Sequence, residues 1–207
     1  MISIVDYGMG NLRSVEKALE KLGFEAHLVS TPEEVGAATK LILPGVGAFG
    51  DAMRGLDQRG LIEPIRSAAA SGTPIMGICL GMQIFFDSSE EDPGVAGLSL
   101  IPGTVRRFRT TELKVPHMGW NDLADIGESK LLANLGPSPY VYFVHSYFVV
   151  PENGAAAAAF TTYGERFVSA VETENICGTQ FHPEKSQAIG MKILRNFAEI
   201  REAALSQ

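Results

Sequence analysis

A cysteine between two glycines, at the point where an apolar run changes into a helical pattern, constrains this chain more than any other feature. Thr73-Pro74-Ile75-Met76 precedes Gly77-Ile78-Cys79-Leu80-Gly81, and a helical pattern continues to Phe86. This order predicts a sharp strand-to-helix turn that presents a nucleophile. The glycines allow close backbone approach, and a helix N-terminus favours a thiolate at Cys79. The competing interpretation is that Cys79 is a buried structural cysteine. Other motifs in the chain, described below, favour the nucleophile instead.

Strand and helix patterns alternate as far as about Asp87. Apolar runs predict strands at 2–5, 26–29, 40–43 and 73–78. Apolar spacing predicts helices at 12–22, from Thr31-Pro32 onward, and at 51–70 with an interruption near Gly60 and Pro64. Strands that alternate with helices and are apolar on both faces indicate a parallel sheet covered on each side.

Beyond Asp87 the pattern changes to short strand-like segments separated by turn residues. They lie at 98–100, 105–108, 140–150, 156–162, 168–172 and 178–181, and a last helix is expected at 186–205. Such spacing is typical of antiparallel strands. We therefore expect an α/β fold, with a mostly parallel central sheet flanked by helices and additional antiparallel strands, in a single domain over residues 1–207.

Composition excludes several classes of function. The net charge of −7 over 207 residues argues against a general nucleic-acid surface, and the basic segment 106–109 reads as a solvated strand end or a partner contact. No run reaches the length of a membrane span, and the N-terminus does not resemble a signal peptide. The two cysteines form no disulfide framework or zinc spacing. A free reactive thiol favours a cytoplasmic location.

A candidate base and its orienting group lie about a hundred residues after Cys79. In Gln180-Phe181-His182-Pro183-Glu184, proline stiffens the backbone between the imidazole and the carboxylate. The carboxylate can then set the tautomer of His182, as a cysteine nucleophile requires. The alternative is a strand-end histidine paired locally with Glu184.

Acyl transfer also needs N–H donors aimed at the developing oxyanion. The N–H of Leu80 follows the nucleophile directly, and the loop Pro44-Gly45-Val46-Gly47 ends a neighbouring strand. We expect the N–H groups of Val46 and Gly47 to contribute, although such a loop is also a common strand-end turn.

These motifs resemble those of class I (triad) glutamine amidotransferases over nearly the full chain. Within that class the chain is similar to the family of glutaminase subunits of imidazole glycerol phosphate synthase. The segments that carry this resemblance are 6–12 (DYGMGNL), 43–49 (LPGVGAF), 116–121 (PHMGWN), 142–147 (YFVHSY) and 181–186 (FHPEKS), together with 77–83 (GICLGMQ). The resemblance implies a flavodoxin-like fold.

The resemblance also implies a role for each site residue. Cys79 attacks L-glutamine, His182 transfers protons and Glu184 orients His182. Substrate binding is implied for Gly45, Gln83, Glu91, His145, Ser146 and Tyr147, and Gln83 lies one helical turn after Cys79. For Glu91 the alternative is a solvated charge, and for His145 it is a core histidine.

The implied partner is a (β/α)8-barrel cyclase subunit, which would form a heterodimer with this chain and receive ammonia from it. Trp120 is the candidate interface anchor, although burial in the core is the commoner fate of tryptophan. Asn11 and Lys185 are candidates for the same face. No cofactor, metal, nucleic acid or membrane is implied. The open alternatives are a sibling amidotransferase with another acceptor, a non-catalytic binding subunit and a stand-alone cysteine hydrolase.

Overall fold

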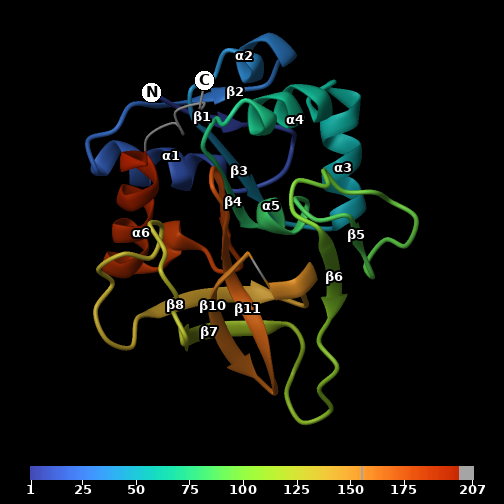
Figure 1. Ribbon diagram of the computed structural model, residues 1–207, viewed down its shortest axis with the longest axis vertical. Helices are drawn as coiled ribbons and strands as arrows, with labels where there is room; N and C mark the ends of the chain where they lie inside the picture. The colour runs from blue at the N-terminus through green and yellow to red at the C-terminus, as the bar shows by residue number, and fades with distance from the viewer. Residues whose placement is uncertain (155, 201–207) are drawn as a thin grey trace.

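A seven-stranded sheet forms the centre of the computed structural model, which describes residues 1–154 and 156–200 (Figure 1). Its strands are β1 (Ile2–Val5), β2 (Ala26–Val29), β3 (Leu41–Gly45), β4 (Ile75–Cys79), β10 (Ala157–Tyr163), β11 (Glu165–Glu172) and β12 (Ile176–Thr179). The spatial order is β10-β11-β12-β4-β3-β1-β2. The five strands from β12 to β2 run parallel, whereas β11 and β10 add an antiparallel edge. The expected mostly parallel sheet is confirmed.

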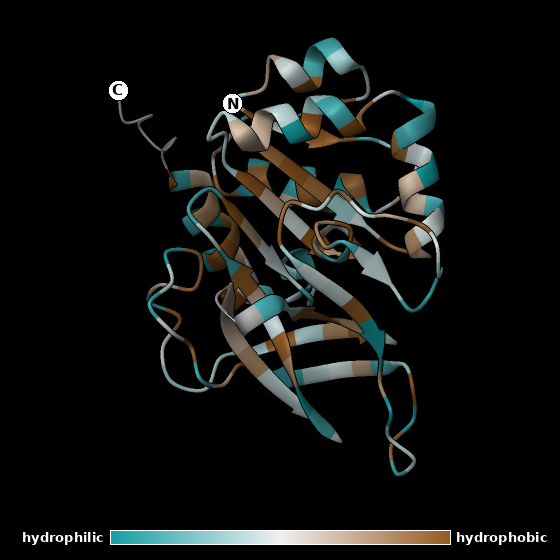
Figure 2. Cartoon of the chain, turned by 45° about the vertical axis from the view of Figure 1, so that its right-hand side comes forward, coloured by the Kyte–Doolittle hydropathy of each residue, from teal (hydrophilic) through white to brown (hydrophobic). Residues whose placement is uncertain are grey.

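Helices cover both faces of this sheet because its strands are apolar on both sides. They are α1 (Leu12–Lys21), α2 (Pro32–Gly36), α3 (Phe49–Gln58), α4 (Ile62–Ala70), α5 (Leu80–Gln83) and α6 (Gln187–Glu199). Ile4 and Ile42 share a core with α1 and α6, whereas Val5 and Leu43 share one with α2 to α5. Figure 2 shows the result, with hydrophobic central strands and polar residues on the outer sides of the helices.

Local sequence signals explain where several helices begin and end. Thr31 caps α2 through its hydroxyl, which accepts from Glu34 N, while the Glu34 carboxylate accepts from Thr31 N. The expected helix over 51–70 divides at Gly60, whose positive φ of 66° ends α3. Pro64 does not interrupt α4 because it lies in the first turn, where no intrahelical donor is needed.

Two smaller sheets lie beside the central one. β5 (Ser88–Ser89), β6 (Gly103–Arg107) and β9 (Tyr147–Pro151) form one, and β7 (His117–Asp122) and β8 (Tyr140–His145) form the other. Short 3-10 helices occupy Glu152–Gly154 and Pro183–Lys185. The expected strand over 140–150 is wrong as one unit: it divides at Ser146, because β8 pairs with β7 while β9 pairs with β6.

Three further expectations need correction. No strand forms at 98–100, because the N–H groups of Leu98 and Leu100 donate to the carbonyls of Ile84 and Phe85. The α-helix α5 ends at Gln83 instead of Phe86, because the N–H groups of Phe85 and Phe86 donate to carbonyls three residues back instead of four. The last helix ends at Glu199, and residues 201–205 of the expected range lie outside the described part of the chain.

Candidate active site

Cys79 is the last residue of β4 and stands on a strained turn. Its φ of 56° and ψ of −111° place a non-glycine residue in a conformation that costs free energy unless its surroundings enforce it. The surroundings are tight: a Cβ on Gly77 would lie 2.5 Å from Gly81 O, and one on Gly81 would lie 1.7 Å from Leu43 O. The predicted strand-to-helix turn is therefore present, and both flanking glycines are sterically required. With only four residues in α5, the helix dipole contributes less at Cys79 than expected.

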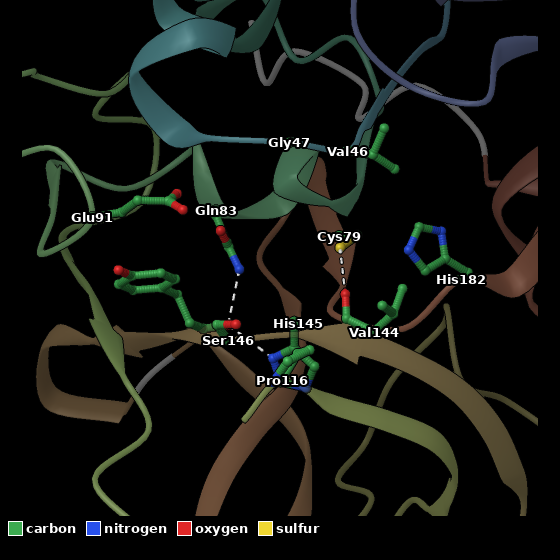
Figure 3. Close-up of a pocket in the computed structure, with 11 residues that line it drawn as sticks. Val46, Gly47, Cys79, Gln83, Glu91, Pro116, Val144, His145, Ser146 and His182 are labelled. Atoms are coloured by element: carbon green, nitrogen blue, oxygen red, sulfur yellow. Dashed lines mark hydrogen bonds between the residues drawn. The ribbon is translucent and has the colours of Figure 1, made fainter. Parts of the chain in front are cut away.

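A buried His–Glu pair lies beside Cys79. Nδ1 of His182 is 2.9 Å from Oε1 of Glu184, and both side chains are almost fully buried. The carboxylate accepts from Nδ1–H, which leaves Nε2 free to take or give a proton. Nε2 has no hydrogen-bond partner within residues 1–154 and 156–200, and its ring lies on the rim of the cavity that holds Cys79 (Figure 3).

The electrostatics favour a charged imidazole. Burial alone lowers the pKa of His182, but interaction with Cys79 and the hydrogen bond and charge of Glu184 outweigh it and raise the pKa to about 9. An imidazolium beside the sulfur stabilises its ionised form, which is the form that attacks a carbonyl carbon. The second cysteine, Cys177, differs: burial, and then the charge of Glu172, raise its pKa well above the ordinary range.

A cavity of about 280 Å³ opens over Cys79. It is lined by Val46, Gly47, Cys79, Gln83, Glu91, Pro116, Val144, His145, Ser146, Tyr147 and His182. Nine of these eleven residues were expected from the sequence. Seven come from the ends of β3, β4 and β8 and the segments after them, while Glu91 follows β5 and His182 follows β12. Pro116 and Val144 were missed as individual residues, although both lie within motifs singled out for the resemblance. Gly45, Leu80 and Glu184, which were also expected at the site, do not line this cavity.

Two expected substrate-binding side chains are held in place by backbone groups. Gln83 donates from Nε2 to Tyr147 O at 3.0 Å. Glu91 accepts from Phe49 N at 2.9 Å, so its carboxylate lies at the first residue of α3 instead of being freely solvated. Burial raises the pKa of Glu91, and the nearby charges of Asp92 and Asp51 also raise it. The hydrogen bond from Phe49 N lowers the pKa but does not cancel these effects.

The expected oxyanion loop follows β3 and packs against the segment after β1. A Cβ on Gly45 would lie 2.5 Å from the hydroxyl of Tyr7, and Gly47 has a positive φ of 103°. The Tyr7 hydroxyl donates to Pro44 O at 2.6 Å and is fully buried. Burial, and then the charge of Cys79, raise the pKa of Tyr7, so it remains a donor at neutral pH. Sequence reasoning missed this positioning role of Tyr7.

His145 belongs to a buried pair with His117, and its side chain does not face the cavity as a free group. His117 Nδ1 lies 3.0 Å from His145 Nε2, and His145 Nδ1 lies 2.8 Å from Tyr147 O. Because a carbonyl only accepts, Nδ1 of His145 carries its proton and its Nε2 accepts from His117. Burial lowers the pKa of His117 to about 4 and that of His145 to about 3, so both rings are neutral. The ring of His117 stacks on Phe143.

The three expected interface residues lie outside the cavity. Trp120 is 46% exposed on β7, and Asn11 and Lys185 are exposed as well. The arginines of the basic segment are partly neutralised, since Arg106 pairs with Glu165 at 2.6 Å. In the described part of the chain, no group of three or more metal-ligating side chains is close enough to hold an ion, and no helix is long and apolar enough to span a membrane.

A cysteine on a strand-to-helix turn, with a His–Glu pair beside it in an open α/β sheet, is the arrangement of a cysteine hydrolase. A family model described as glutamine amidotransferase class-I matches residues 3–200. The imidazole glycerol phosphate synthase subunit HisH of Geobacter sulfurreducens is 50% identical over 206 residues, which cover 97% of this chain and 99% of that relative. The corresponding HisH of Methanothermobacter thermautotrophicus is 49% identical over 203 residues, with 98% and 100% covered. The chain belongs to the HisH family of class-I glutamine amidotransferases.

Solved structures support the same fold. A crystal structure of a glutamine amidotransferase superposes with a TM-score of 0.76 at 21% identity, covering 96% of this chain and 98% of the other. A chain of PurLQS from Thermotoga maritima gives a TM-score of 0.73 at 23% identity, with 95% and 96% covered. At these identities the likeness concerns the fold alone.

Proposed function

We propose that this chain is the glutamine amidotransferase subunit of imidazole glycerol phosphate synthase, in which it hydrolyses L-glutamine to glutamate and ammonia. The ammonia passes to a cyclase subunit, which converts PRFAR to imidazole glycerol phosphate and AICAR in histidine biosynthesis. The observation that carries the proposal is the position of Cys79 on its strained turn, beside the buried His182–Glu184 pair and at the base of one cavity. The HisH relatives supply the particular reaction.

The chemistry follows from these three side chains. The Cys79 sulfur adds to the carboxamide carbon of glutamine after its proton has passed to Nε2 of His182. His182 then protonates the leaving nitrogen, the C–N bond breaks, and ammonia departs to leave a glutamyl thioester. Water, activated by His182, cleaves the C–S bond, which gives glutamate and restores the thiol. Glu184 holds the imidazole in the tautomer required at each step.

The oxyanion of each tetrahedral intermediate requires donors in place beforehand. We assign this role to the N–H groups of Leu80, Val46 and Gly47, which belong to the residues that follow β4 and β3. The close contacts at Gly45 and the Tyr7–Pro44 hydrogen bond support a preorganised loop.

The amino-acid end of glutamine would occupy the opposite part of the cavity. In Figure 3, Gln83 and Glu91 lie on the side of the cavity away from His182. Glu91 offers a carboxylate for the α-ammonium group, and the backbone of His145-Ser146-Tyr147 offers hydrogen bonds to the α-carboxylate. Gly45 supports the site from β3 by leaving room for the adjacent helix.

We place the cyclase, a (β/α)8 barrel, on the exposed apolar strip formed by Met118, Trp120 and Tyr140. These side chains are 63%, 46% and 54% exposed. In the β7–β8 ladder Met118 pairs with Val144, and Val144 also lines the cavity with its carbonyl near the Cys79 sulfur. The strip therefore adjoins the site, and a short sheltered route for ammonia fits this arrangement. Asn11 and Lys185 would contribute polar contacts to the same heterodimer.

The proposal also includes a single domain over residues 1–207 and a cytoplasmic location. The family match over residues 3–200 and the continuous central sheet support the first. Free thiols at Cys79 and Cys177 fit a reducing compartment.

The test is a glutaminase assay on the chain alone and with a purified barrel cyclase and its ribonucleotide substrate. We expect glutamate formation to increase on addition of the cyclase, glutamine-dependent formation of imidazole glycerol phosphate, and loss of both in Cys79→Ala. Cys177→Ala is the matched control and should retain activity. An active chain that supplies ammonia to a different synthase and not to the cyclase would refute the assigned partner. Activity in Cys79→Ala would refute the mechanism.

A further inference from the structure

Gln180 is a fully buried amide next to the nucleophile, in a position that the mechanism above does not use. Its Nε2 lies 3.6 Å from the Sγ of Cys79, and its Oε1 lies 3.0 Å from Nε2 of Gln83. The side chain follows β12 and has no exposed area. Sequence reasoning named Gln180 only as a neighbour of His182.

The orientation of this amide follows from its neighbours. Tyr147 O can only accept, so the group of Gln83 that faces it at 3.0 Å is the NH2. The same NH2 faces Gln180 and therefore requires the carbonyl oxygen of Gln180 on that side. The NH2 of Gln180 is consequently directed at the sulfur, which acts as the acceptor.

One hydrogen bond from His145 also holds the Tyr147 carbonyl in place. Its Nδ1–H donates to the same Tyr147 carbonyl at 2.8 Å, so that oxygen receives two donors. The carbonyl fixes Gln83, Gln83 fixes Gln180, and Gln180 presents a donor to Cys79. A donor held in place beforehand, and away from water, stabilises a negative charge more than water-exposed groups do.

We infer that Gln180 is a further catalytic residue: its side-chain N–H donates to the sulfur of Cys79 and stabilises the thiolate form of the nucleophile. The inference rests on the proposed role of Cys79 as the nucleophile. Donation to a charged sulfur is the strong kind of hydrogen bond, whereas the neutral thiol is a weak acceptor. Gln180 therefore favours the charged form and adds to the effect of His182.

Other groups near the sulfur also influence its ionisation and must be held constant in the test. The titratable side chains that interact electrostatically with Cys79 or line its cavity are Tyr7, Glu91, His145, Tyr147 and His182, and Glu184 accepts a hydrogen bond from His182. None of them is altered in the variants below.

The experiment measures the rate at which iodoacetamide alkylates Cys79 in the full-length chain between pH 5 and pH 10. The thiolate displaces iodide, so the midpoint of the rate profile reports the ionisation of this sulfur. Peptide mass spectrometry separates Cys79 from the buried Cys177. We expect Gln180→Met to move the midpoint upward by about 1 to 2 pH units, because it removes one hydrogen bond to a charged group.

Thr179→Val is the matched control. Thr179 is also fully buried at the end of β12, and its hydroxyl donates to Phe181 O at 3.0 Å, away from the sulfur. This variant loses a buried hydrogen bond of similar kind and should leave the alkylation midpoint unchanged. If Gln180→Met does not fold, Gln180→Leu also removes the donor without adding a charge beside the sulfur, and its midpoint should also rise.

An unchanged midpoint in a folded Gln180 variant would overturn the inference, as would an equal rise in Thr179→Val. The alkylation assay uses no glutamine and no cyclase. A failed inference is thus distinguishable from a failed function: wild-type glutaminase activity with an unchanged midpoint refutes only Gln180, whereas a shifted midpoint without glutaminase activity refutes only the proposed reaction.

Discussion

Gly81 offers a sharp test of how the nucleophile turn is held. A Cβ at this position would lie 1.7 Å from the carbonyl oxygen of Leu43, whereas real Cβ atoms do not approach closer than 3.0 Å. Substitution by alanine therefore requires β3 and the start of α5 to separate by about 1.3 Å. Both are backbone segments in a packed core, so no flexible side chain can relieve the contact. Overpacking of this kind costs about 3 kcal/mol.

We expect Gly81→Ala to lower the midpoint of thermal unfolding by about 6 to 12 °C, given about 2 to 4 °C per kcal/mol for a chain of this length. Residual folded protein should lose about 10²- to 10³-fold in glutaminase turnover, because the displacement separates the N–H of Leu80 from the loop after Gly45. Differential scanning calorimetry and the cyclase-stimulated glutaminase assay measure the two effects.

Gly36→Ala is the control for the general effect of replacing glycine. Gly36 ends α2, and a Cβ there would meet no atom within 4 Å. Alanine should be neutral or stabilise the protein by up to about 1 kcal/mol. Our steric reasoning would be refuted by a Gly81→Ala protein that melts within 2 °C of the wild type, a margin of about 1 kcal/mol.

Three further predictions concern the triad, the histidine pair and the exposed strip. Glu184→Gln should lower kcat by about 10²- to 10⁴-fold with little change in KM, because His182 loses its charged partner; steady-state kinetics with unchanged kcat would contradict this. His145 and His117 have pKa values lowered by burial, so their stabilising contribution is complete above about pH 6.5 and is lost as the pH falls toward 4 and 3. Between neutral pH and pH 5, the lowered pKa of His145 alone should reduce the free energy of unfolding by about 2 kcal/mol. Imidazole NMR that gives His145 a pKa near 6.5 would disprove this. Trp120→Ala should weaken cyclase binding by about 30-fold or more without destabilising the isolated chain. Leu28→Ala, which removes an exposed apolar side chain on β2, is the control and should leave cyclase binding unchanged. Calorimetric titration of each variant with the cyclase measures the two affinities.

Much of the first half of the fold was predictable because its signals are local. The strand at 2–5 and the strand at 26–29 have the bounds that apolar runs predict, and α2 begins at Pro32 as the Thr31-Pro32 signal predicts. Gly60 ends a helix through its own backbone conformation. Each of these features depends on residues within a few positions of one another.

The second half was less predictable because long-range pairing decides it. Ser146 divides one apolar run into two strands only because β7 and β6 provide different partners. The segment at 98–100 forms no strand because Leu98 and Leu100 donate to Ile84 and Phe85, partners that the sequence around it does not reveal.

The residues of the candidate site also divide into those that local signals predict and those that depend on long-range contacts. Cys79, His182 and Glu184 could be named from short motifs, since glycine spacing and a proline-stiffened pair are local signals. The contact between Gln180 and Cys79 joins residues 101 positions apart, so nothing in either neighbourhood predicts it. The pairing of His117 with His145 likewise depends on the β7–β8 register.

That register has a consequence for which sequence changes this chain can accept. His117 and His145 face inward from opposite positions of the ladder, while Met118 and Trp120, on the same strand, face outward. Inserting or deleting one residue within β7 would reverse which of its side chains face inward. Trp120 would then point into the aromatic interior, and His117 would point into water. Length variation among homologues should therefore accumulate in the loops that flank this ladder and be absent from its strands.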